Sequence, residues 1–371
     1  MRITRVESIP VRVPLRAGMI ARTAHGLHHT SDYVIVRVYT DQGLVGLGEA
    51  TVSALWSGET STSAKGAIDG LLGPALVGKD PTAITEARRV MDFLIKQNPF
   101  TKAAIEMALW DLTGKAWGRP VYELLGGKAR DLIPTKMMIG AFDLDRVREM
   151  AERFLAAGAR CLKVKVGLDV AGDVRRVQAV REVAGAAIPI TIDANCGWDQ
   201  PTARRALGEL RPMHLLAVEQ PIAAGDPEAL ARLRAVAGAP LIADESVFTL
   251  SDAWSVLRAQ AADVISIYPG KNGGIAAAVE IAHLARAAGA PCHLGSNLEL
   301  GVGSAAMAHL AAALPNLDSE TYPADLIGPH YHEADLLAEP LELSYAHARV
   351  PDGPGLGVTI DEDTLKRFRV D

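Results

Sequence analysis

Three acidic residues recur at nearly equal intervals in this chain, and each closes a short apolar run. They are Asp193 in ITIDANCGW, Glu219 in LAVEQPI and Asp244 in LIADESV, with gaps of 26 and 25 residues. Such runs at such spacing predict consecutive strand–helix units of a parallel barrel, with the three carboxylates at one rim. Hard oxygen ligands there would suit Mg²⁺, or Mn²⁺ in its place. The alternative is that the three acids are salt-bridge partners at the rim.

Two lysines lie two residues apart in CLKVKVG, at Lys163 and Lys165. On a strand, both would point to the same face. Burying two ammonium groups is costly unless anions are near, and the three carboxylates would be those anions. A like charge beside it makes a lysine easier to deprotonate, so one of the pair is expected to be a general base. The alternative is an exposed lysine pair at a strand edge.

The segments that must position these residues repeat through most of the chain. Short apolar strands alternate with helical stretches rich in Ala, Arg and Glu, which predicts an α/β fold with a (β/α) barrel of the TIM type. The expected strands are 136–141, 161–166, 189–194, 215–220, 241–245, 263–268, 291–295 and a weaker one near 317–322.

The chain outside the barrel has a different pattern. Residues 1 to about 60 alternate like antiparallel strands, and residues 80–127 have an apolar face at the helical period. We therefore predict an α+β capping domain over 1–130, a (β/α) barrel catalytic domain over 131–325, and a segment over 326–371 that returns to the capping domain.

The composition is that of an ordinary globular protein, with 371 residues, 49% hydrophobic and 22% charged. A formal net charge of −6 argues against a nucleic-acid partner. We find no apolar segment long enough for a membrane span and none resembling a signal peptide. Three cysteines, an odd number, favour reduced thiols. We expect a cytoplasmic protein, a homo-oligomer, that binds neither membranes nor nucleic acid.

Several motifs together resemble the enolase superfamily, specifically the muconate cycloisomerase subgroup of the mandelate racemase/muconate lactonizing enzyme family. The motifs are Lys-x-Lys at 163–165, DAN at 193–195, EQP at 219–221, ADES at 243–246 and LWDLTGKAWGRPVYELLGG at 109–127. The resemblance covers essentially the whole chain. It implies that Asp193, Glu219 and Asp244 bind Mg²⁺ and that Lys165 is the acid/base. It also implies that Lys163 assists Lys165 and contacts a substrate carboxylate.

Other residues have supporting roles in this interpretation. Asn195 belongs to the DAN motif, and Glu299 in GSNLELGVG matches an acid in the seventh-strand loop of the lactonizing enzymes. Trp56 lies in a loop of the capping domain, where an aromatic ring could exclude water or could pack within the cap. We expect these side chains, with Lys271, to bind substrate or to support the residues that do.

The sequence departs from the family pattern at one position. Relatives usually carry a second catalytic lysine five residues before a Gly-Gly pair, but this chain has Tyr268 there, in ISIYPGKNGG. Lys271 lies two residues before the glycines, where relatives also tend to be basic, and the alternative is that it reaches the site. The role of Tyr268 stays open between proton donor, stacking partner and pocket wall.

The implied chemistry is removal of a proton α to a carboxylate, which converts a monoanion into an enediolate. A divalent cation and a lysine would stabilise the charge that develops. One competent base suits cycloisomerization or β-elimination of a small carboxylate. The alternative is a racemase or epimerase of an amino-acid derivative that uses Tyr268 or Lys271 as a second proton carrier. A third possibility is a ligand-binding barrel without catalysis.

Overall fold

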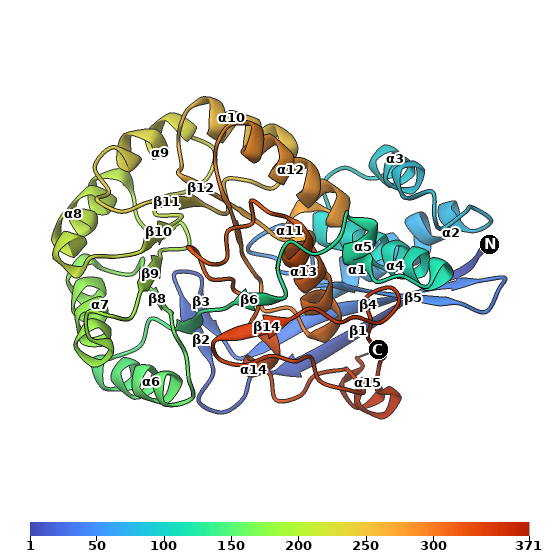
Figure 1. Cartoon of the computed structure of the whole chain (residues 1–371), viewed down its shortest axis with the longest axis horizontal. Coiled ribbons are helices and arrows are strands. Elements are labelled where there is room, and N and C mark those ends of the chain that lie inside the picture. The colour runs from blue at the N-terminus through green and yellow to red at the C-terminus, as the bar shows by residue number, and fades with distance from the viewer. Residues whose placement is uncertain (371) are drawn as a thin grey trace.

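The computed structural model describes residues 1–370 and contains two layers of different architecture (Figure 1). A parallel sheet curls inside an arc of helices, and an antiparallel sheet with its own helices lies beside the open side of that arc. Within residues 1–370, no helix is both long enough and apolar enough to cross a membrane.

The antiparallel sheet of the cap has the order β1-β4-β5, with β1 at Ile3–Pro14, β4 at Thr30–Thr40 and β5 at Val45–Ala50. Helix α4 (Pro99–Trp117) packs directly on β5. Gly48 permits this contact, because a Cβ there would collide with the carbonyl oxygen of Ala104. Helices α1 (Ser61–Ala67) and α3 (Ile84–Leu94) complete the cap.

The barrel contains seven regular parallel strands in the order β13-β12-β11-β10-β9-β8-β7. Each overlaps a predicted strand: β7 Met137–Ile139, β8 Leu162–Lys165, β9 Ile190–Asp193, β10 Ala217–Glu219, β11 Leu241–Ala243, β12 Val264–Ile267 and β13 Cys292–Leu294. The main helices between and after them are α6 Leu144–Ala156, α7 Val170–Ala184, α8 Gln200–Leu210, α9 Pro227–Arg234, α10 Leu250–Arg258, α12 Ile275–Ala287 and α13 Gly301–Ala313. The predicted barrel architecture is confirmed.

The eighth strand differs from the prediction for 317–322. In its place an irregular segment closes the ring through two isolated parallel bridges, Cys292 with Leu317 and Thr135 with Ala324. Pro323 interrupts the pattern because it has no N–H to donate to a neighbouring strand. This closure matters for the site, since the same segment carries Asp325 to the rim and bonds its N–H to the Leu294 carbonyl at 2.9 Å.

The carboxyl-terminal residues return to the cap (Figure 1). Strand β14 (His347–Arg349) pairs with β6 (Leu132–Pro134) before helix α15 (Glu362–Phe368) packs on β1. The N–H of Val370 donates to the Pro10 carbonyl at 3.0 Å.

A short hairpin brings the cap to the barrel mouth. It is formed by β2 (Ala21–Thr23) and β3 (Gly26–His28), which pair antiparallel. The N–H of Ala141, just after β7, donates to the Arg22 carbonyl at 2.7 Å. The hairpin is thereby fixed beside the carboxyl end of the first barrel strand.

Candidate active site

Three neighbouring strands deliver the acids singled out in the sequence. Strand β9 ends at Asp193 and β10 ends at Glu219, and these two residues are direct register partners. Asp244 follows the last residue of β11. All three are at most 2% exposed, so their carboxylates are removed from water at one end of the barrel.

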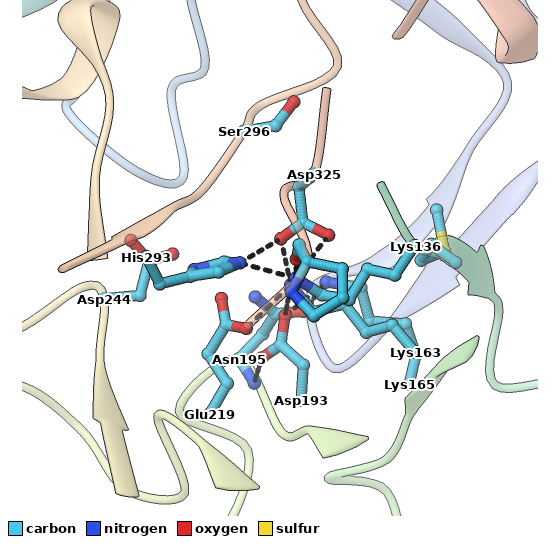
Figure 2. Close-up of polar contacts among 12 residues, drawn as sticks. Lys136, Lys163, Lys165, Asp193, Asn195, Glu219, Asp244, His293, Ser296 and Asp325 are labelled. Atoms are coloured by element: carbon cyan, nitrogen blue, oxygen red, sulfur yellow. Dashed lines mark hydrogen bonds and ion pairs between the residues drawn. The ribbon is translucent and has the colours of Figure 1, made fainter. Parts of the chain in front are cut away.

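The β8 lysines contact two of these acids (Figure 2). Lys165 Nζ donates to Asp193 Oδ2 at 2.5 Å and to Asn195 Oδ1 at 2.8 Å. Lys163 Nζ lies 2.7 Å from Glu219 Oε2 and 3.4 Å from Asp193 Oδ2. Both lysines therefore project from the same face of the strand into the acidic rim, and the exposed strand-edge alternative is excluded.

The third acid has its own lysine. Lys271, on the short helix α11 (Pro269–Asn272), donates to Asp244 Oδ1 at 2.6 Å. The same ammonium donates to the backbone oxygens of Asp244 at 2.8 Å and Ser266 at 2.9 Å. Lys271 is 0% exposed. It is thus held by three protein oxygens behind Asp244.

A second ion-pair network adjoins Lys163 on the far side from Glu219. Asp325 Oδ2 accepts from Lys163 Nζ at 2.7 Å, and Asp325 Oδ1 lies 3.1 Å from Lys136 Nζ. Lys136 also donates to His293 Nε2 at 2.5 Å and to the Pro323 carbonyl at 2.6 Å. Burial and the nearby Lys136 charge hold the pKa of His293 well below its usual value, so the imidazole accepts this bond as a neutral ring.

Figure 2 shows how these groups meet. In this view Asp325 approaches the central ammonium groups from above and His293 from the left, whereas Glu219 and Asp193 approach from below. Burial alone would lower the pKa of Lys163. The surrounding carboxylates together have the larger effect and raise this pKa well above its usual value. Lys163 is therefore a fixed positive charge.

Potential ligand atoms of Glu219, His293 and Asp325 lie within 4.8 Å of one another and could hold a metal ion. Lys163 contacts Glu219 and Asp325, and Lys136 contacts Asp325 and His293, so all three residues already touch a lysine ammonium. Lysines also contact the carboxylates at the ends of β9, β10 and β11, so the donor type separates the two groups. Those strand ends offer three carboxylates, the ligands that suit Mg²⁺, whereas this group includes an imidazole.

Glu245 adds another acid to the rim. Its Oε1 accepts from Asn195 Nδ2 at 3.0 Å, whereas its Oε2 is buried and accepts no hydrogen bond from residues 1–370. Burial and the adjacent Asp244 raise the pKa of Glu245 well above its usual range. Glu219 Oε2 is also buried without a partner in hydrogen-bond geometry, despite its ion pair with Lys163.

Tyr268 directly follows the last residue of β12. It is 0% exposed, and within the described chain its hydroxyl makes no hydrogen bond. Its ring centroid lies 6.2 Å from that of Trp56 and 5.0 Å from Lys271 Nζ. Burial and the Asp244 charge raise the pKa of Tyr268 well above 10, so the hydroxyl stays protonated.

Glu299 lies in the loop after β13, where the sequence placed it. It accepts from Ser296 Oγ at 2.6 Å and from the Asn297 N–H at 3.1 Å. Asn297 in turn donates to the Thr51 carbonyl of the cap at 3.0 Å. Glu299 therefore shapes a loop that joins barrel to cap.

A cavity of about 330 Å³ opens above the lysines. The hairpin 21–28, the cap segment 51–56 and the loop 296–298 form its walls, and Lys163, Lys165, Asn195 and Asp325 lie at its base. Trp56 lines one side. The cavity is of a size that holds a small molecule in contact with the β8 lysines.

Sequence reasoning missed Lys136, Asp325 and Glu245. Lys136 had a detectable signal, because a lysine inside a predicted barrel strand requires a buried anion. Glu245 belongs to the ADES motif, but on a regular strand it would point away from the face that carries Asp244. Strand β11 ends at Ala243, so this alternation does not apply to either residue. Asp325 follows Pro323 in an irregular segment that no periodicity could place.

The comparisons with known proteins agree with this geometry. Residues 146–364 match the Enolase C-terminal domain-like family, and residues 4–126 match the Mandelate racemase/muconate lactonizing enzyme N-terminal domain. The chain belongs to the mandelate racemase/muconate lactonizing enzyme family. The family resemblance read from the sequence motifs is confirmed.

Members of this family with different activities are similarly close to the chain. N-succinyl-L-Arg/Lys racemase of Bacillus cereus is 34% identical over 100% of this chain and 98% of its own length. Chloromuconate cycloisomerase of Cupriavidus pinatubonensis is 35% identical over 98% and 96%. The crystal structure of 2-chloromuconate cycloisomerase from Rhodococcus opacus superposes with a TM-score of 0.96 at 34% identity, covering 100% of both chains. Family membership therefore does not decide between a racemase and a cycloisomerase.

Proposed function

We propose that Asp193, Glu219 and Asp244 hold a divalent cation, Mg²⁺ in the first instance. The donor set consists of hard carboxylate oxygens at one rim, as Mg²⁺ prefers. The buried Glu219 Oε2 lacks a hydrogen bond, which is uncommon in folded proteins and fits an oxygen reserved for a ligand. Burial raises the pKa of Glu219 to about 7, a cost that a bound cation would relieve.

The residues around such a site divide the chemistry between them. The cation would neutralise a substrate carboxylate and the negative charge that builds up on it. Lys165, at the cavity base, would remove the proton α to that carboxylate. Lys163, locked between Asp325 and Glu219, would supply fixed positive charge beside the same group.

We propose further that proton transfer is confined to the Lys165 face, as in a cycloisomerization or β-elimination. The observation that carries this proposal is the difference in access between the two lysines. Lys165 lines the cavity, but Lys271 is 0% exposed and bonded to three protein oxygens. Tyr268, with its raised pKa, is a poor base on that side.

A racemase or epimerase is the second candidate. The unpartnered hydroxyl of Tyr268 supports it, because a buried phenol could return a proton on the face opposite Lys165. The similarity to a racemase named for N-succinyl-L-Arg/Lys also supports it.

Incubation in D₂O separates these candidates. With a panel of α-chiral carboxylates and added Mg²⁺, a one-base enzyme exchanges the α-proton of one enantiomer without inversion. A two-base enzyme interconverts both enantiomers, and Tyr268→Phe should then abolish interconversion. Proton NMR with chiral chromatography reads both outcomes.

A further inference from the structure

The cavity wall carries very little positive charge. Among the residues that line it, the cationic side chains are Lys163 and Lys165, both at the base. Lys165 is the proposed base, and Lys163 is already paired with Asp325 at 2.7 Å and with Glu219 at 2.7 Å. Neither ammonium is free to bind a second carboxylate at the other end of a ligand.

The upper walls are apolar or neutral. Leu27 of the hairpin is 59% exposed and Leu55 of the cap is 70% exposed, and both line the cavity with Trp56. The hairpin histidines do not change this picture, since burial lowers the pKa of His25 and of His28.

The two acids in the wall already hold the cations near them, so those cations are not free for a distal carboxylate. Asp325 lies at the base, and Asp32 lies near the hairpin with its carboxylate 2.7 Å from Arg12. A second carboxylate held against these walls would lose water and meet no unpaired cation among the lining residues. Burying an unpaired anion in this way is strongly unfavourable.

We infer that the substrate is a monocarboxylate whose remaining part is uncharged and partly apolar. This inference rests on the proposed function, since the one carboxylate is the group that the cation and Lys163 would bind. It excludes dicarboxylates of the muconate type as the preferred ligands.

A matched pair of unreactive ligands tests it. Adipate and monomethyl adipate share a six-carbon chain and differ by one charge. Isothermal titration calorimetry with the Mg²⁺-loaded protein measures both affinities. Monomethyl adipate should bind at least about 10-fold more tightly than adipate, which corresponds to a difference of roughly 1.4 kcal/mol in binding free energy. Equal or tighter binding of adipate would overturn the inference while leaving the proposed carboxylate site intact.

A designed cation gives the reverse test. Leu55→Lys should shift the ratio of the two dissociation constants toward adipate by about 10-fold, because the new ammonium faces the distal end. Leu71→Lys, at a position 37% exposed and outside the cavity lining, should leave the ratio unchanged. No shift in Leu55→Lys would contradict the assigned orientation. If neither ligand binds in an Mg²⁺-dependent manner, the proposed function fails, and the inference fails with it.

Discussion

The Lys271 ammonium lies 2.6 Å from Asp244 Oδ1 and is completely buried, so the lysine nearest the family's second-base position is tied to a proposed metal ligand. Removing one partner of such a pair leaves an uncompensated buried charge. We expect Lys271→Met to lower the free energy of unfolding by roughly 3–5 kcal/mol. Added Mg²⁺ should recover part of the loss by binding the freed carboxylate.

Chemical denaturation with and without Mg²⁺ measures this effect. Lys366→Met on α15 is the control, because Lys366 is exposed. An Lys271→Met protein as stable as the control would show that the pair with Asp244 contributes little.

Lys165 should be indispensable for proton transfer. Its Nζ is held by Asp193 and Asn195 at the base of the cavity. In Lys165→Ala, exchange of the α-proton should fall by roughly 10²–10⁴-fold or more, since general acid–base catalysis contributes that much. Near-normal exchange in a folded Lys165→Ala protein, checked by circular dichroism, would refute the assignment.

Metal affinity should depend on Asp244. Asp244→Asn keeps the shape of the side chain and an oxygen for Lys271 but removes the negative charge. We expect the Mg²⁺ dissociation constant, measured by calorimetry, to rise by at least roughly 10–100-fold. That is the loss typical when a residue that only hydrogen-bonds to a metal ligand is changed. Asp363 is exposed on α15, so the Asp363→Asn protein should keep the wild-type dissociation constant for Mg²⁺. Equal affinity in both variants would place the cation elsewhere, for example at Glu219, His293 and Asp325.

Stability should decline with rising pH through Glu49, which joins cap to barrel. Its carboxyl group is 1% exposed and accepts from the N–H groups of Leu300 at 2.8 Å and Gly303 at 3.0 Å. Burial raises its pKa to about 8, so the folded protein retains a proton that the unfolded chain has lost. This contribution is complete below about pH 4.5 and disappears as the pH rises through about 8.

The expected loss is on the order of a few kcal/mol between about pH 5 and pH 8. Glu49→Gln should flatten that slope, even if it lowers stability overall by changing one acceptor to a donor. Glu339→Gln, at an exposed position, should keep the wild-type slope. An unchanged slope in Glu49→Gln would assign the pH dependence to other groups.

The sequence was sufficient for the barrel because its strands are apolar runs at regular spacing. It also placed Asp193, Glu219 and Asp244 on adjacent strand ends, where alternation and register put them near Lys163 and Lys165. These features depend on local pattern. Pattern is what a single sequence preserves best.

The partners of Lys163 required the tertiary structure. Asp325 lies 162 positions away and reaches Lys163 only because an irregular segment closes the ring. The sequence also could not predict the burial of Lys271, because nothing in PGKNGG indicates that its ammonium donates to Asp244. Both facts bear on reactivity, so the sequence predicted the site but left the number of bases undecided.

The central claim is that a metal-dependent proton abstraction occurs on the Lys165 face alone. Its most direct test is α-proton exchange in D₂O, followed by NMR for each enantiomer of every carboxylate that the Mg²⁺-loaded protein accepts. The account predicts that one enantiomer exchanges with retention, that Lys165→Ala abolishes this exchange, and that Tyr268→Phe preserves it. Exchange and interconversion of both enantiomers, lost in Tyr268→Phe, would contradict the account.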